Sequence, residues 1–233
     1  METDGFEATA DVLEVGWCDV DVETRAVGHP QSYLCRVEHS PPDSRAIHHI
    51  RASDTAGFPP YDRRILFEEA ARAGVVTFAA HTADHEAKFI MGSIPLICTH
   101  KASLRVWPEA PSHSVFGLLY WLEDSDLVSF DRAAAQPSHR AGPDAYATAH
   151  LLAAMLAGGV TGAELFQWTR EPRVLPRCPI GKYRGRPWAE VDSGFLEWIL
   201  SKHDMEPDFR WNAARELAGK NVMNLWVWHL LAK

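Results

Sequence analysis

The sequence lacks the features of a membrane-spanning, secreted or disordered chain. No apolar run approaches the roughly 18 residues that a spanning helix needs. No basic segment leads from Met1 into an apolar stretch, so we expect no secretory signal and a cytoplasmic location. Hydrophobic residues make up 46% and charged residues 23% of the 233 residues, which is ordinary globular usage. We therefore expect a folded chain with a buried core and no membrane partner.

Cysteine is scarce, and its spacing excludes one class of site. The chain has 4 cysteines, and no two of them form a C-x-x-C pair. Structural zinc sites are typically built from such closely spaced pairs, so we expect none here. Free thiols in a reducing compartment are the simplest interpretation. The cysteines are Cys18, Cys35, Cys98 and Cys178.

Positive charge is also in deficit. The chain has 23 Lys and Arg against 31 Asp and Glu, a net charge of −8, which argues against coating nucleic acid by bulk charge. It does not argue against a local basic patch, because bases cluster with prolines and glycines over residues 170–187. We place a domain boundary there, between a domain over residues 1–168 and a small, mainly helical unit over residues 169–233.

Hydrophobic periodicity predicts strands first and helices later along the chain. This order indicates an α/β or α+β layered domain. The segment Ser40–Ser44 is expected to be a loop, and Gly74 to end a helix. The predicted strands cover 12–20, 31–37 and 75–80, and the predicted helices cover 61–73, 84–91, 101–106, 115–122, 143–157, 195–200 and 209–218.

The segment Ser138–Ala145 brings a histidine and a carboxylate together. His139 precedes a predicted helix and Asp144 lies in its first turn, so both face the same opening. A carboxylate can hold a hard cation, and a neutral histidine can take a proton from a metal-bound water. An acid favoured by the helix dipole beside an exposed histidine would give the same pattern.

Two further segments carry acids near predicted strands. His81–Glu86 follows the buried strand 75–80, at the kind of strand end where α/β sites are built. Phe6–Thr9, with Glu7, precedes the strand that begins at Val12. Taken alone, His81–Glu86 is also typical of a capped helix start. Taken alone, Phe6–Thr9 does not indicate a site.

Taken in order, the three segments resemble the DEDDh-type 3′–5′ exonucleases of the RNase H-like superfamily, and within them the exonuclease X-like group. The resemblance continues through Ile97–Lys101, Leu104–Pro108 and Thr148-Ala149. It extends to Gly181-Lys182-Tyr183-Arg184-Gly185 and Phe195–Trp198, so it covers most of the chain.

The resemblance implies a fold, an activity and a set of residues. The fold is an RNase H-like mixed β-sheet flanked by helices, with a small helical C-terminal unit. The activity is metal-dependent hydrolysis of phosphodiester bonds at nucleic-acid 3′ ends, with two Mg²⁺ or Mn²⁺ ions as cofactors and single-stranded DNA as the favoured partner. The implied metal ligands are Glu7, Glu86 and Asp144, with Asp4 as a substitute; the implied catalytic residues are His139 and Glu7; the implied nucleic-acid contacts are Phe6, Ala8, Thr9, His81, Lys182 and Arg184.

The sequence departs from the family pattern in its acidic motifs. Gly5 stands where the D-x-E motif that ends at Glu7 has its Asp, and Met1–Asp4 has little apolar content for a central strand. The mid-chain motif has Glu86 for the usual Asp. Asp21-Val22-Glu23-Thr24 reads as D-x-E-T, but we interpret it as a solvated turn after the strand that begins at Val12.

These departures leave two other classes of function open. One is a catalytically inactive nucleic-acid-binding module that keeps the fold and the basic segment. The other is a subunit-interaction protein, such as a homodimer, in which the apolar tail with Trp226 and Trp228 forms the contact. RNA also remains an alternative to DNA.

Overall fold

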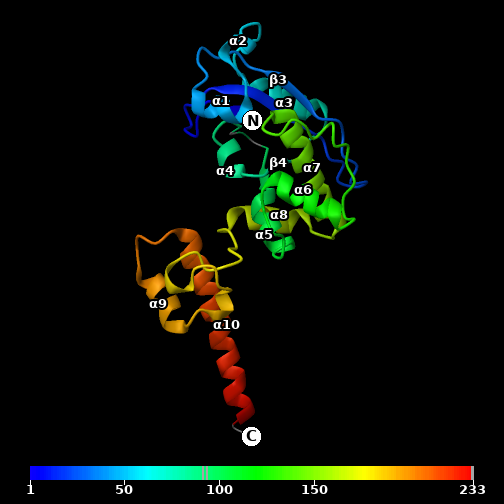
Figure 1. Ribbon diagram of the computed structural model, residues 1–233. Helices are drawn as coiled ribbons and strands as arrows, with labels where there is room; N and C mark the ends of the chain where they lie inside the picture. Colours follow the sequence, from blue (N-terminus) through cyan, green and yellow to red (C-terminus); the bar gives the residue numbers. More distant parts are fainter. Residues whose placement is uncertain (91, 93, 232–233) are drawn as a thin grey trace. The chain divides into compact units, whose positions relative to one another are not determined.

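The computed structural model describes residues 1–231 except 91 and 93, with side chains as far as residue 220 (Figure 1). The chain divides into two compact units. The N-terminal unit comprises residues 1–103 and 109–169, and the C-terminal unit comprises residues 104–108 and 170–233. The assignment of an exonuclease domain to 1–168 and a separate unit to 169–233 stays a prediction, because compactness does not establish what each part does.

The N-terminal unit contains two small sheets. Strands β1 (Glu2–Thr3), β2 (Val12–Trp17) and β3 (Gln31–Leu34) form an antiparallel sheet in that order, and Glu2 lies opposite Glu14. Strands β4 (Phe78–Ala80) and β5 (Leu96–Cys98) pair in parallel. The predicted mixed α/β fold is confirmed, and β1 forms despite its poor apolar content because β2 supplies its hydrogen-bond partners.

Helices flank these sheets. One of them, α1, occupies part of the segment that we expected to be a loop, because Pro42 sits in the first helical turn, where a missing N–H costs nothing. Strand β5 and the helices over Ala52–Thr55 and Gly162–Arg170 were not predicted. The helix predicted over 84–91 forms only over Ala83–Glu86, and residue 91 lies outside the described residues. The helices are α1 (Pro42–His48), α2 (Ala52–Thr55), α3 (Arg63–Arg72), α4 (Ala83–Glu86), α5 (Thr99–Val106), α6 (Val115–Asp124), α7 (Ala141–Ala157) and α8 (Gly162–Arg170).

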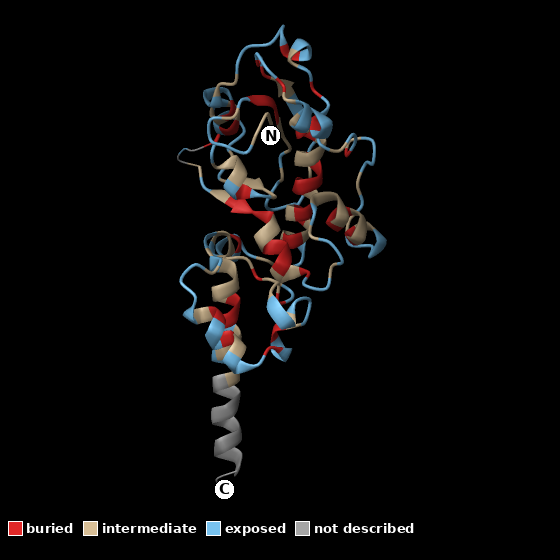
Figure 2. Cartoon of the chain, turned by 60° about the vertical axis from the view of Figure 1, so that its left-hand side comes forward, coloured by how far each residue is buried: buried red, intermediate tan, exposed pale blue. Residues whose placement is uncertain are grey.

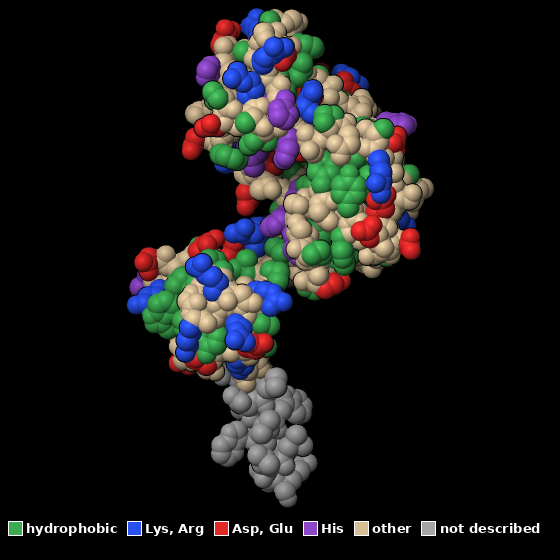
Figure 3. Space-filling model, viewed as in Figure 1, with side chains coloured by type: hydrophobic (Ala, Val, Ile, Leu, Met, Phe, Trp, Pro, Cys, Tyr) green, Lys and Arg blue, Asp and Glu red, His purple; other side chains and the backbone are tan. Residues whose placement is uncertain are grey.

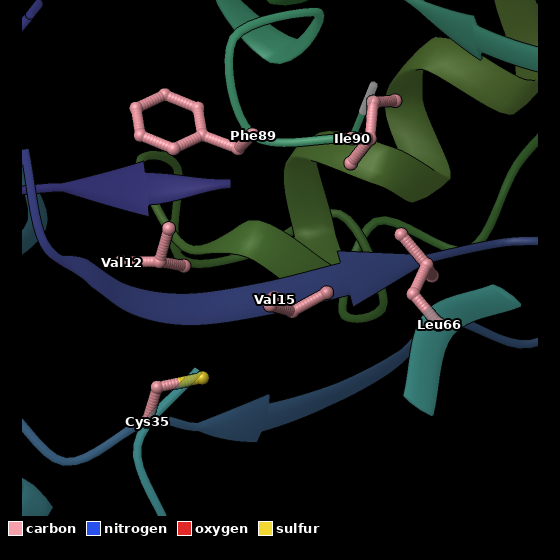
Figure 4. Packing of buried hydrophobic residues seen from close by; sticks show 6 residues of the cluster. All are labelled: Val12, Val15, Cys35, Leu66, Phe89 and Ile90. Carbon is pink, nitrogen blue, oxygen red and sulfur yellow. The ribbon is translucent and has the colours of Figure 1, made fainter. Parts of the chain in front are cut away.

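Strand β2 is buried on both faces, which makes it the centre of the unit. Val12 and Val15 lie in one cluster with Cys35, Leu66, Phe89 and Ile90 (Figure 4). Leu13 faces the other way and packs with Val37 and Ile50. Glu14 lies in the middle of this apolar strand and is only 2% exposed, so its carboxylate requires a partner.

Helix α7 packs closely on β2. Many of its residues are buried (Figure 2), and several of these are alanines, which allow a short helix-to-strand distance. A Cβ added at Gly16 of β2 would lie 2.1 Å from the carbonyl carbon of Ala141, the first residue of α7. Glycine is therefore required at this position, and the start of α7 is fixed against the centre of the sheet.

The C-terminal unit is mainly helical, as expected. It contains the short turns η1 (Gly181–Tyr183) and η2 (Trp188–Glu190), then α9 (Ser193–Ser201) and α10 (Pro207–Leu231). Its core consists of Cys178, Trp188, Val191, Leu196, Ile199 and Ala213. Trp226 and Trp228, the residues of the predicted subunit contact, lie beyond the part of the chain whose side chains the structure describes.

All four cysteines are free, and three of them are buried. Among the described helices, none alone is long and apolar enough to cross a membrane, and one bent pair, α7 with α8, meets that test by length and composition only.

Candidate functional site

His139 and Asp144 meet at the start of α7, as their spacing predicts. The backbone N–H of His139 donates to Asp144 Oδ1 at 3.0 Å. The backbone of His139 is left-handed, with φ of 59°, and its side chain is exposed. The turn thus places an imidazole at the surface directly beside a carboxylate of the first helical turn.

The partner of buried Glu14 is Arg140, the residue between these two. Arg140 donates from Nε and from Nη2 to the two oxygens of Glu14, each at 2.8 Å, and Ala141 N–H adds a third bond at 3.0 Å. Burial alone would raise the pKa of Glu14, but the hydrogen bonds from Arg140 and Ala141 lower it below its usual value. This ion pair fixes the His139–Asp144 turn to the centre of the sheet.

Glu2 is a candidate site residue that our sequence analysis missed. It lies on β1 opposite Glu14, and burial raises its pKa to about 7. The Met1 ammonium lowers the pKa of Glu2, and the negative charges of Asp144 and Glu14 add to the rise. The signal that could have found it is the acid-x-acid pattern Glu2-Thr3-Asp4, which our sequence analysis did not consider.

Glu86, at the end of α4, is a third carboxylate near the chain's N-terminal ammonium. Its Oε1 lies 3.7 Å from the Met1 ammonium nitrogen. Its Oε2 is buried and has no hydrogen-bond partner among the described residues. The pKa of Asp144 is raised, mainly by burial, and the Met1 ammonium opposes that shift. Glu2, Glu86 and Asp144 therefore share one positively charged neighbour.

This donor set suits a hard divalent cation, which prefers carboxylate oxygens. The buried, unpaired Oε2 of Glu86 and the raised pKa values of Glu2 and Asp144 are the properties of carboxylates that a cation would stabilise. As placed, however, no three His, Cys, Asp or Glu side chains of the described residues lie close enough together to hold one ion.

Comparison with solved structures relates the fold of the chain to a known one. The chain is similar to exonuclease X in complex with 5′ overhanging duplex DNA, at 26% identity and a TM-score of 0.54, over 72% of this chain and 95% of that one. The chain has an exonuclease fold. No protein-family model matches it, and no curated protein matches it either. The similarity supports a nuclease-like function in general terms.

Within the exonuclease fold, Glu7 and Asp4 lie on the loop between β1 and β2. Glu7 is exposed, and its carbonyl accepts a bond from Ala10 N–H in a turn. Asp4 Oδ1 accepts from Asp11 N–H at 2.8 Å, which closes the loop. The metal-binding roles of Glu7 and Asp4 stay predictions, and Glu2 is the acid of this region that lies near Asp144.

The three residues expected to contact nucleic acid near the first motif are on the same loop. Phe6, Ala8 and Thr9 are all exposed, and Phe6 is 77% exposed. The ring of Phe6 meets the ring of His85 edge-on, with centroids 6.0 Å apart. Lys88 Nζ donates to the Phe6 carbonyl and holds the loop near α4. Their contact with nucleic acid stays a prediction.

The ring of His81 is held by contacts within the protein. Its Nε2 lies 2.7 Å from the His113 carbonyl oxygen, and its Nδ1 lies 3.1 Å from the Thr99 hydroxyl. Burial lowers the pKa of His81, so the neutral ring is favoured. Both ring nitrogens are engaged within the protein, and the predicted contact of His81 with nucleic acid gains no support from this placement.

Lys182 and Arg184 lie in the C-terminal unit. Lys182 Nζ pairs with Asp192 Oδ2 at 3.1 Å. Arg184 is exposed. The predicted contacts of Lys182 and Arg184 with nucleic acid stay predictions. The acids of the Asp21–Thr24 segment, by contrast, form the solvated turn that we expected: Asp21 Oδ1 accepts from the N–H groups of Glu23 and Thr24.

Proposed function

We propose that the protein is a metal-dependent 3′–5′ exonuclease that hydrolyses phosphodiester bonds at DNA 3′ ends. The observation that supports this proposal is that Glu2, Glu86 and Asp144 all interact with the Met1 ammonium, and that Asp144 lies beside His139, within an exonuclease fold. The 3′ polarity, the preference for DNA and the metal dependence rest on the resemblance of the motifs to the DEDDh exonucleases.

Glu2, Glu86 and Asp144 would hold the Mg²⁺ or Mn²⁺ ions, two in number in this family. When bound, the ions supply charge stabilisation of the phosphate and lower the pKa of the attacking water. Glu2 takes the position that our sequence analysis gave to Glu7. Asp4, two residues after Glu2, is then the other acid of the first motif. The motif reads E-x-D here instead of D-x-E.

The residues of the chain itself have separate tasks in this proposal. His139 takes the proton of the attacking water, which its exposed imidazole can then release to solvent. The backbone N–H of His139 orients the Asp144 carboxylate. Arg140, through its ion pair with Glu14, keeps the turn that carries both groups in place.

A catalytically inactive nucleic-acid-binding protein is the second candidate. The observation that favours it is the spread of the carboxylates, since no three of them among the described residues lie close enough to hold an ion. In this case the fold and its basic C-terminal unit would bind nucleic acid without cleaving it.

One assay separates the two candidates. The purified chain is incubated with 5′-labelled single-stranded DNA and Mn²⁺ or Mg²⁺, with EDTA as the blank. Stepwise shortening from the 3′ end supports the exonuclease, whereas an intact substrate that remains bound supports the second candidate. The variants Glu2→Gln and Glu7→Gln form a matched pair: loss of cleavage only in the first assigns the ligand to Glu2, and loss only in the second assigns it to Glu7.

A further inference from the structure

The motif Gly181–Gly185 is not explained by the candidate site, and it forms an ordered loop in the C-terminal unit. Gly185 N–H donates to the Cys178 carbonyl and Cys178 N–H donates to the Arg186 carbonyl, each at 2.8 Å. Gly181 and Gly185 have φ of 60° and 80°, which glycine adopts without strain. A Cβ at Gly181 would lie 2.7 Å from the ring of Phe195. The loop therefore packs directly on α9.

One carboxylate attaches this loop to the helix. Asp192 caps α9 by accepting from Phe195 N–H at 2.7 Å, and it also accepts from Tyr183 Oη and Lys182 Nζ. The loop and the helix thus present one continuous surface, which we call the loop–α9 surface. It comprises Lys182, Tyr183, Arg184, Phe195, Trp198 and Lys202.

Three aromatic rings adjoin one another along this surface. The centroids of Tyr183 and Phe195 are 5.2 Å apart, edge to face. Those of Phe195 and Trp198 are 5.1 Å apart, with the planes only 27° from parallel. Trp198, the last ring of the row, is 44% exposed. Nucleic-acid bases stack on exposed aromatic rings of this kind.

Cations lie at both ends of the row of rings. Lys202 Nζ is 5.7 Å from the centre of the Trp198 ring, and Arg184 lies on the loop at the opposite end of α9. Within the described residues, neither Arg184 nor Lys202 has an acidic partner. Lys182 is paired with Asp192, so we assign phosphate binding to Arg184 and Lys202.

The charge of the unit points to an anionic partner. The C-terminal unit contains 12 Lys and Arg against 8 Asp and Glu, whereas the N-terminal unit contains 11 against 23. Figure 3 shows Lys and Arg side chains interleaved with hydrophobic ones over the unit that carries α9. A charge asymmetry of this kind within one chain is typical of nucleic-acid binding.

We infer that the loop–α9 surface binds single-stranded nucleic acid, with a base stacked on Trp198 and phosphates on Arg184 and Lys202. Bases of a duplex are already stacked on each other and do not offer their faces, so the rings select single strands. The inference takes its substrate class from the proposed function but does not require cleavage.

The test measures binding in EDTA, where hydrolysis is blocked. A 5′-fluorescein-labelled oligothymidylate and a blunt duplex of equal length are titrated with the full chain at several salt concentrations. The variants are Trp198→Ala, Trp198→Phe and Arg184→Glu. The matched controls are Phe58→Ala, an exposed aromatic residue of the acidic unit, and Arg36→Glu, an exposed arginine of that unit.

We expect Trp198→Ala to weaken single-strand binding on the order of 10-fold, because stacking on one ring is lost. Trp198→Phe, which keeps an aromatic face, should recover most of that loss and excludes misfolding as its cause. Arg184→Glu should weaken binding and reduce the salt slope by about one. Both controls should bind like the unmodified protein.

Several results would overturn the inference. Unchanged binding in Trp198→Ala would remove the stacking role, and equal losses for the duplex would remove the single-strand preference. A change in oligomeric state on light scattering, with binding intact, would make the surface a contact between copies. Active cleavage with unchanged binding in the variants would refute this inference alone, and absence of cleavage with the expected binding losses would refute only the proposed activity.

Discussion

Glu14 and Arg140 are 126 positions apart in the chain, and they form a two-point ion pair between the centre of the sheet and the start of α7. The Glu14 side chain is only 3% exposed. Removing one partner of such a pair leaves the other charge buried without compensation, which costs more than the intact pair contributes.

Glu14→Gln should therefore lower the free energy of unfolding by about 3 kcal/mol. The control is Glu123→Gln, which breaks the two-point pair of Glu123 with Arg132, whose side chain is 68% exposed. That variant should lose about 1 kcal/mol or less. Urea unfolding gives both values, and equal losses would show that Glu14 is no more important than a surface acid.

Gly16→Ala should disturb the start of α7. Its Cβ would collide with the backbone of Ala141, which cannot turn aside as a side chain can. We expect a loss of about 1–3 kcal/mol in stability. Gly57→Ala, with nothing within 4 Å of the new Cβ, is the control and should change stability by about 0.5 kcal/mol or less. A melting temperature for Gly16→Ala as high as that of the control would contradict the close approach.

Metal binding should depend on pH through Glu2. Its pKa is raised to about 7, so an ion that binds Glu2 must displace a proton below that pH. Mn²⁺ affinity, measured by calorimetry, should rise from pH 5 to pH 7 in the unmodified protein. The rise in affinity should be smaller in Glu2→Gln. In Glu7→Gln it should be as large as in the unmodified protein. If Glu7→Gln flattens the curve and Glu2→Gln does not, the ligand is Glu7.

His139 can be tested without disturbing its backbone. Its φ of 59° is left-handed, a conformation that asparagine tolerates better than alanine. His139→Asn should lower the cleavage rate by roughly 10²–10⁴ if the imidazole removes the proton from water. Mn²⁺ affinity should stay the same, because the Asp144 contact comes from the backbone N–H. Wild-type turnover would exclude His139 as the base.

The environment of His81 should make the N-terminal unit sensitive to acid. Burial holds the pKa of His81 below its unfolded value near 6.5, so the unfolded chain binds the proton first. The contribution of His81 to stability is complete above about pH 6.5 and falls as the pH drops below it. His81→Gln should reduce the loss of stability between pH 7.5 and pH 5. The control His29→Gln, at an exposed position, should leave that loss of stability unchanged. Equal effects of the two substitutions would contradict the role of the buried His81 ring.

Local patterns predicted the parts of the fold that carry strong periodicity. The helix that begins near Pro143 and the strand that begins at Val12 were both found from spacing alone. Strand β1 has two residues and exists only because β2 pairs with it, so Glu2 gave no periodic signal. The partnership of Glu14 with Arg140 joins distant segments, and no local pattern could reveal it.

Asp192 holds three donors, and its pKa is lowered to about 2, first by the hydrogen bond from Tyr183 and then by those from Phe195 and Lys182. The aromatic row therefore keeps its attachment in mild acid, whereas Glu2 takes up a proton near neutrality. If both proposals hold, moderate acidification separates nucleic-acid binding from cleavage. The loop–α9 surface keeps the bound single-stranded nucleic acid, while the metal ligands become protonated. A nuclease of this design could be loaded at pH 5 and started synchronously by a jump to pH 8.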